Sequence, residues 1–271
     1  MKAFAPGHIT GFFSAVHHDD PLETGSLGAG IVIDDGVHVK VEQASETIVV
    51  TEGERVEFPT VERVLGMLDV EARVEVESNV PVGCGFGASG AATLATALAA
   101  NELFELGHDR NQVVAAAHVA EVKEGTGLGD VVPQSLGGVV TRVEAGAPEI
   151  GTFGQIDFED TTVEYTAFGG LDTAEVLGDE GVMEKVNTAG ESALDGLLKE
   201  PSLDELLDLS WEFALETGLA TERVQDEVGK VRREGGKASM AMLGETAFGV
   251  GTEDVLENKT RIAEEGARIL D

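Results

Sequence analysis

The chain has 271 residues, of which 51 are Asp or Glu and 18 are Lys or Arg, so its formal net charge is −33. A surface this acidic repels nucleic-acid phosphates and anionic lipid headgroups, and we expect neither a nucleic acid nor a membrane as a partner. Because 42% of the residues are hydrophobic, the composition excludes a disordered chain and predicts a folded globule with a sizeable core. The acidic residues are dispersed rather than gathered in a tail, which is typical of a solvated surface and indicates a salt-loaded cell, that of a halophile.

The first predicted elements are a short strand at 2–5 and a long loop over 11–28, whose Gly, His, Asp and Pro content is typical of functional loops. Asp35 and Gly36 stand between two apolar runs and predict a β-hairpin. Further elements before residue 150 are expected as strands at 48–51, 73–78 and 139–143, and as helices at 61–68, 88–106 and 111–123.

The order of the predicted helices and strands changes near residue 150. The elements expected beyond it are a strand at 163–168, helices at 181–198, 203–217 and 221–234, a hairpin over 237–251 and a final helix over 258–270. No flexible linker separates the two parts, so we expect them to share one interface.

Three features of the sequence predict a cytoplasmic location. The single cysteine, Cys84, allows no intrachain disulfide, which is typical of a reducing compartment. The N-terminus lacks the apolar stretch of a secretory signal. No run reaches the roughly 18 apolar residues that a membrane-spanning helix needs.

The most informative segment is a glycine-rich loop between the strand that ends at residue 78 and the helix that begins at residue 88. Glycine lets the backbone approach a ligand closely, and the N-terminus of a helix offers unpaired N–H groups to an anion. We therefore predict a phosphate site there. Its candidate residues are Gly83, Gly85, Gly87, Ala88, Ser89 and Gly90.

The spacing of this loop also permits a dinucleotide-binding interpretation. Gly85, Gly87 and Gly90 match the Gly-x-Gly-x-x-Gly fingerprint, whereas no Gly-Lys-Ser/Thr sequence of a classical P-loop exists. A dinucleotide fold would need a second strand with an acidic end about 20 residues later, but residues 101–123 predict a helix, a turn and a helix. A dinucleotide-dependent oxidoreductase stays the alternative from another enzyme class.

A second glycine loop, residues 125–129, leads to Asp130 and follows the helix that carries Glu121. Phosphoryl transfer needs one carboxylate that coordinates Mg²⁺ between phosphates and another that orients or deprotonates the attacking hydroxyl. Glu121 suits the first task, together with the Ser89 hydroxyl. Asp130 suits the second.

These motifs, in this order, resemble the GHMP kinase superfamily, whose central motif is Pro-x3-Gly-Leu-Gly-Ser-Ser-Ala-Ala. The corresponding stretch is Pro81–Ala91, with Phe86 in place of Leu and Ala88 in place of the first Ser. The resemblance implies that Ser89 helps to bind Mg²⁺ and that Asp130 is the catalytic residue. The pair Gly235 and Gly236 resembles the C-terminal glycine motif.

The resemblance covers nearly the whole chain and implies an α+β protein with the GHMP kinase fold. Residues 1–150 would form the ATP-binding domain, with a ribosomal-protein-S5-domain-2-like part. Residues 151–271 would form the C-terminal domain, with a ferredoxin-like part, in the same globule. ATP and Mg²⁺ are the implied cofactors, and a homodimer would be in keeping with similar kinases.

Within the superfamily, the chain is similar to the archaeal pantoate kinases. The stretches that carry this similarity are 6–13, 20–22, 25–30 and 126–131, with Gln134 and the glycines at 137 and 138. It implies ATP-dependent phosphorylation of pantoate to 4-phosphopantoate in coenzyme A biosynthesis.

The implied substrate is an anion, so an acidic protein must supply local positive charge. Arg142 is the candidate, because a guanidinium binds a carboxylate with two parallel hydrogen bonds. Several GHMP kinases have Lys where this chain has His8, which we interpret as a hydrogen-bonding group of the substrate site. Thr10 and Ser26 are further candidates for hydroxyl contacts.

Two alternatives stay open besides the oxidoreductase. One is another small-molecule kinase of the same superfamily, acting on homoserine or shikimate. The other is a non-catalytic nucleotide-binding protein.

Overall fold

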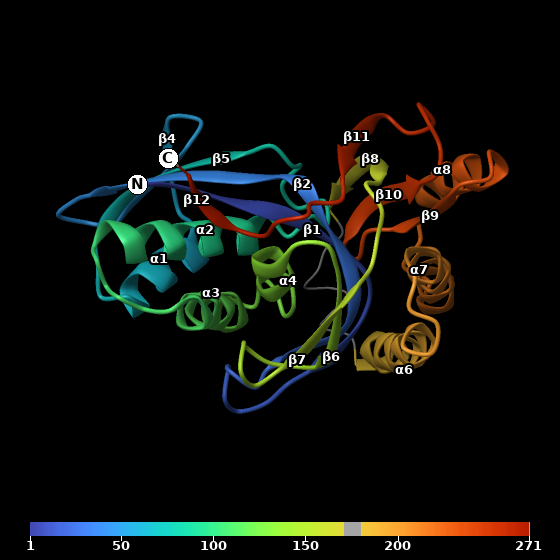
Figure 1. The fold of residues 1–271 in the computed structure, drawn as a ribbon, viewed down its shortest axis with the longest axis horizontal. Helices are drawn as coiled ribbons and strands as arrows, with labels where there is room; N and C mark the ends of the chain where they lie inside the picture. The colour runs from blue at the N-terminus through green and yellow to red at the C-terminus, as the bar shows by residue number, and fades with distance from the viewer. Residues whose placement is uncertain (171–179, 271) are drawn as a thin grey trace.

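The computed structural model describes residues 1–170 and 180–270, which form two β-sheets flanked by helices (Figure 1). The strands are β1 (Lys2–Val16), β2 (Gly25–Gln43), β3 (Ile48–Thr51), β4 (Glu54–Val56), β5 (Ala72–Ser78), β6 (Val139–Glu144), β7 (Thr152–Ile156), β8 (Thr162–Gly170), β9 (Lys237–Met240), β10 (Gly244–Val250), β11 (Asn258–Arg261) and β12 (Arg268–Leu270). The helices are α1 (Pro59–Met67), α2 (Ala88–Leu103), α3 (Arg110–Glu124), α4 (Val131–Leu136), α6 (Glu180–Leu197), α7 (Leu203–Thr217) and α8 (Glu222–Arg233).

The larger sheet has the strand order β12-β1-β2-β5-β3-β4, and β6 and β7 extend it from β2. Its pairs are antiparallel except β3 with β5. Helices α1, α2 and α3 cover one face of this sheet, and the two chain ends lie together because β12 pairs with β1 (Figure 1). The core between sheet and helices is built from Val, Leu and many Ala side chains.

Helix α2 passes through the middle of this core. Ten of its residues are buried, so the helix is apolar all round rather than on one face. Its small side chains, such as Ala91 and Ala95, let α2 lie close to β1 and β2. This packing fixes the N-terminus of α2, and with it the glycine-rich loop that precedes it.

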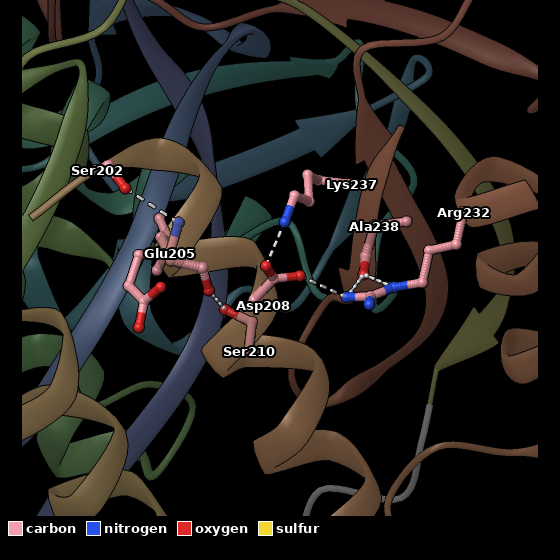
Figure 2. A network of polar contacts seen from close by, with 8 residues as sticks. Ser202, Glu205, Asp208, Ser210, Arg232, Lys237 and Ala238 are labelled. Carbon is pink, nitrogen blue, oxygen red and sulfur yellow. Dashed lines mark hydrogen bonds and ion pairs between the residues drawn. The ribbon is translucent and has the colours of Figure 1, made fainter. Parts of the chain in front are cut away.

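The smaller sheet has the order β11-β8-β10-β9 and lies with α6, α7 and α8 at the other end of the molecule (Figure 1). Figure 2 shows how polar contacts join three of these elements. Asp208 of α7 accepts hydrogen bonds from Arg232 of α8 (3.2 Å) and from Lys237 of β9, and Arg232 also donates to the Ala238 carbonyl (3.1 Å). Ser202 caps α7 by accepting from the Glu205 N–H.

The predicted hairpin at Asp35 and Gly36 is wrong, because β2 runs without a break through both residues. Opposite them, the register with β1 shifts between Pro6 and Gly7. Proline has no N–H for the ladder, so a bulge rather than a turn accommodates it. A β-carbon at Gly36 would lie 2.2 Å from the Ala5 carbonyl oxygen, and the glycine therefore marks a close approach.

The predicted loop over 11–28 is wrong at both ends. Strand β1 continues to Val16 and β2 begins at Gly25, so the connection is only residues 17–24. The pairing of these strand ends, with Phe13 opposite Gly28, places their polar side chains beside the cavity described below.

The predicted final helix over 258–270 is wrong. This segment connects the two sheets: Asn258 lies opposite Tyr165 in the smaller sheet, and Leu270 lies opposite Lys2 in the larger one. Between them, a β-carbon at Gly266 would lie 2.2 Å from the Ser135 carbonyl oxygen. Tertiary pairing has overridden a helical composition here.

The hairpin predicted over 237–251 is confirmed, since β9 and β10 are antiparallel neighbours. The turn lies at 241–243, with Leu243 in the left-handed region (φ 63°). Gly244 already belongs to β10 and packs against Cys84, where a β-carbon would lie 2.0 Å from the carbonyl oxygen. Within residues 1–170 and 180–270, no helix has both the length and the apolar composition needed to cross a bilayer.

Candidate active site

A cavity of about 760 Å³ lies where the glycine-rich loops, the ends of β1 and β2, β6 and the turn after β9 meet. This volume is in the range of small-molecule sites. Its walls include every candidate residue of the sequence analysis except His8. The candidates that line it are Thr10, Ser26, Gly83, Gly85, Gly87, Ala88, Ser89, Gly90, Glu121, Asp130 and Arg142.

The loop before α2 has the backbone conformation of an anion site. Gly83, Gly85 and Gly87 all have positive φ (77°, 86° and 61°), which side-chain-bearing residues rarely adopt. Gly87 is the N-cap of α2, and no side chain in the described part of the chain caps the helix there. The N–H groups of its first turn are therefore available to a negatively charged ligand.

Ser89 and Glu121 lie together at this end of the cavity. The Ser89 hydroxyl donates to Glu121 Oε1 (2.7 Å), and Thr126 donates to Oε2 (2.9 Å). Thr93, four residues after Ser89 on α2, adds a third contact (3.2 Å). Burial raises the pKa of Glu121, although these hydrogen bonds oppose the rise. The carboxylate and hydroxyl oxygens are hard ligands of the kind that Mg²⁺ prefers.

Asp130 lies at the N-terminus of α4, and the side chain of the buried His8 contacts its carboxylate. The two side chains are 2.7 Å apart, between His8 Nδ1 and Asp130 Oδ1. His8 is completely buried on β1, whereas the Asp130 side chain keeps 28% exposure and lines the cavity. Burial alone would raise the pKa of Asp130, but the contact with His8 and the nearby Arg142 charge hold it below its ordinary value. Asp130 is therefore an ionised acceptor at neutral pH.

Arg142 is the one buried residue among the 18 Lys and Arg, all of which lie in the described ranges. Two glycines make room for its guanidinium: β-carbons at Gly28 and Gly129 would lie 3.1 Å from Nη2 and 2.9 Å from Nε. Neither Nε nor Nη1 has a hydrogen-bond partner among the described residues. Burial, partly offset by the attraction of Asp130, lowers its pKa to about 10. The Arg142 guanidinium can therefore bind an anionic ligand.

Ser26 and Thr10 complete the same region of the cavity. A β-carbon at Gly129 would lie 2.2 Å from the Ser26 hydroxyl, so Ser26 is next to the loop that carries Asp130. The Thr10 hydroxyl lies 3.4 Å from His8 Nδ1. Both side chains line the cavity together with Asp130 and Arg142.

Three residues to which the sequence analysis assigned no role support the site. Thr93 and Thr126 both bind Glu121, and the spacing of Thr93 four residues after Ser89 was a usable clue, because such residues share a helix face. The Gln134 amide donates to the carbonyl oxygen of Gly87 (2.8 Å) and so fixes the start of α2. No sequence pattern indicated that contact, which joins α4 to the glycine loop.

The fold and the site define the class of protein. The family model described as the GHMP kinases N terminal domain matches residues 58–138, which contain the glycine loop, Glu121 and Asp130. A solved structure described as a "Phosphotransferase related to CoA biosynthesis pathway" has a TM-score of 0.89, with 32% identity over 99% of this chain and 97% of that one. The predicted α+β GHMP kinase fold is confirmed.

Curated relatives narrow the assignment. The pantoate kinase of Methanocaldococcus jannaschii is 36% identical over 96% of both chains. The homoserine kinase of Sulfolobus acidocaldarius matches only 29% of this chain, at 37% identity. The chain belongs to the pantoate kinase family of the GHMP kinases.

Proposed function

We propose that the protein phosphorylates the terminal hydroxyl of pantoate with ATP and releases 4-phosphopantoate for coenzyme A biosynthesis. The observation that carries this proposal is the buried guanidinium of Arg142 in the same cavity as Asp130, whose Nε and Nη1 have no hydrogen-bond partner in the part of the chain that the structure describes. Pantoate has a carboxylate at one end and a hydroxyl at the other, so one molecule could engage both residues. Membership of the pantoate kinase family supports the same substrate.

The glycine loop is proposed to bind the ATP phosphates through the uncapped N–H groups of α2. Ser89 and Glu121 fit a Mg²⁺ ion by their oxygen chemistry and by their proximity at 2.7 Å. When bound, the ion would neutralise charge on the phosphates. Gln134 would keep the loop in place through its contact with Gly87.

Asp130 is proposed to orient the attacking hydroxyl by accepting its hydrogen bond. The lowered pKa of Asp130 makes its carboxylate a stable anion and a weak base. Asp130 is therefore better suited to orient the substrate hydroxyl than to keep the proton of that hydroxyl. Arg142 would bind the carboxylate, and Ser26 and Thr10 would contact the remaining oxygens. All four of these side chains line the cavity, which supports the roles proposed for them.

The test is a substrate panel. Purified protein with ATP and Mg²⁺ should release ADP with pantoate, and ³¹P NMR should show a phosphomonoester on its terminal carbon. Homoserine, shikimate and a pantoate analogue without the carboxylate are the controls. Faster turnover of homoserine or shikimate would overturn the substrate assignment. ATP binding without ADP release on any hydroxy acid would favour a non-catalytic nucleotide-binding protein, and bound NAD would favour an oxidoreductase.

We further propose a cytoplasmic enzyme of a salt-loaded cell, without nucleic-acid or membrane partners, which the net charge of −33 and the single cysteine support. A homodimer and a division near residue 150 into an ATP-binding and a C-terminal domain are proposed from the superfamily resemblance alone. Light scattering in molar KCl and limited proteolysis would test these two points.

A further inference from the structure

His8 is completely buried behind Asp130 and is the candidate residue that does not line the cavity. Its backbone N–H donates to the Phe86 carbonyl oxygen (2.9 Å), so its position is tied to the glycine loop. Its ring reaches Asp130 through Nδ1 (2.7 Å). The other ring nitrogen, Nε2, is buried with no hydrogen-bond partner among the described residues.

These contacts determine where the imidazole carries its proton. An ionised carboxylate only accepts hydrogen bonds, so Nδ1 must carry the hydrogen that reaches Asp130 Oδ1. A second proton on Nε2 would create a buried cation near the positive charge of Arg142, and its N–H would have no acceptor within 1–170 and 180–270. Burial accordingly lowers the pKa of His8, despite the attraction of Asp130. The ring is therefore neutral and in one tautomer.

We infer that His8 is a positioning residue for the transfer reaction: its Nδ1–H holds one oxygen of Asp130 and so leaves the other for the substrate hydroxyl. The inference rests on the proposed function for its kinetic part. His8 itself does not touch the substrate in this arrangement. It acts through the orientation and the charge of Asp130.

Other groups that face His8 and Asp130 could also affect kcat and the pKa of Asp130. Among the residues that the structure describes, the charged group that faces His8 besides Asp130 is Arg142 on β6, and Asp130 also faces Glu121 across Gly127. The Thr10 hydroxyl lies 3.4 Å from the same ring nitrogen. Variants at His8 leave all of these groups in place, so their effects report on the hydrogen bond to Asp130.

Two variants separate positioning from packing. His8→Asn keeps an N–H donor at the place of Nδ1, whereas His8→Ala removes it. We expect H8A to lower kcat about 100-fold, with KM for ATP changed less than threefold, and H8N to recover most of that loss. In H8A, the acid limb of the kcat profile should move to higher pH, because Asp130 loses the contact that lowers its pKa. His38→Ala, on the neighbouring strand β2 beside Phe4, is the matched control and should match wild type.

A second measurement does not depend on turnover. ¹⁵N NMR of the histidine side chains should show His8 as the neutral Nδ1–H tautomer, and Asp130→Asn should change that signal. An Nε2–H tautomer, or H8A with wild-type kcat and an unmoved acid limb, would overturn the inference. Equal losses in H8A and H8N, with no shift of the acid limb, would also overturn it, because they indicate packing alone. Wild-type protein that turns over no hydroxy acid refutes the proposed function, and the tautomer still decides the role of His8.

Discussion

Replacement of Arg142 by Met tests whether the buried guanidinium, which we propose binds the substrate, lowers the free energy of unfolding of the ligand-free protein. The pKa of Arg142 falls from the ordinary 12.5 to about 10 even with Asp130 nearby. At about 1.4 kcal/mol for each factor of ten in proton affinity, the ligand-free protein keeps this charge at a cost of about 3 kcal/mol. Methionine has no charge and can occupy the path of the first part of the Arg142 side chain, although it is two atoms shorter, so we expect R142M to be more stable than wild type without ligands, with a melting temperature higher by about 5 °C.

The same substitution should remove substrate binding. Loss of one partner from a buried charged pair costs about 3–5 kcal/mol, so kcat/KM for pantoate should fall by a factor of about 10² to 4 × 10³, chiefly through KM. KM for ATP should stay within about threefold, because Arg142 lies on β6 and not in the glycine loop. Saturating pantoate should raise the melting temperature of wild type and not that of R142M.

Thermal unfolding in molar KCl and initial rates at varied pantoate measure the two effects. Arg142→Lys keeps a charge without the planar fork and should lie between wild type and R142M. Arg55→Met, at an exposed position on β4, is the control for loss of one positive charge. A variant less stable than wild type would refute the stability argument. A variant with unchanged KM for pantoate would show that the carboxylate is bound elsewhere.

Three other substitutions or conditions have expected outcomes. Asp130→Asn should lower kcat at least about 10³-fold while ATP affinity, measured by calorimetry, stays within about threefold; near-normal turnover would remove Asp130 from the mechanism. Glu164→Gln weakens the charge-assisted hydrogen bonds that the N–H groups of Asp254 and Val255 donate to this side chain. At pH values above the ordinary glutamate pKa of about 4.3, the substitution should therefore lower the free energy of unfolding by about 2 kcal/mol. Although burial would raise the pKa of Glu164, these bonds hold it lower, so in urea titrations the difference should disappear as pH falls through that lowered pKa. The melting temperature should rise between low and molar KCl, and a flat profile would contradict the role assigned to the acidic surface.

The sequence predicted the parts of the site that lie on continuous segments. Gly83 to Gly90 before a long helix, and Asp130 after spaced glycines, could be interpreted locally, because each motif carries its backbone geometry with it. The structure brings both motifs to one cavity with Glu121 and Arg142. Their meeting depends on strand pairing, such as Gly28 opposite Arg142, which no local pattern specifies.

The sequence failed where glycine or proline served tertiary contacts instead of turns. Gly36 allows the close approach of two strands beside Pro6, and Gly266 allows a connecting segment to cross Ser135. At Gly36 the local propensity favours a turn, whereas over 258–270 the composition favours a helix, so a prediction from local patterns chooses the wrong structure in both places. His8 was predicted as a group of the substrate site, but it does not line the cavity, because its burial depends on β2 and on the glycine loop, which are distant in sequence.

The distribution of basic residues explains how so acidic a protein can hold two anions. Net charge repels a phosphate or a carboxylate at long range, but molar salt would reduce the Debye length to about 3 Å and suppress that repulsion. What then matters is the charge within contact distance of the ligand. There the protein offers the uncharged N–H groups of α2 and the buried Arg142, and neither can be screened by solvent ions as a surface lysine would be. An acidic surface and an anion-binding site are therefore compatible because they act over different distances, and exposed basic residues such as Arg55 should contribute little to either substrate.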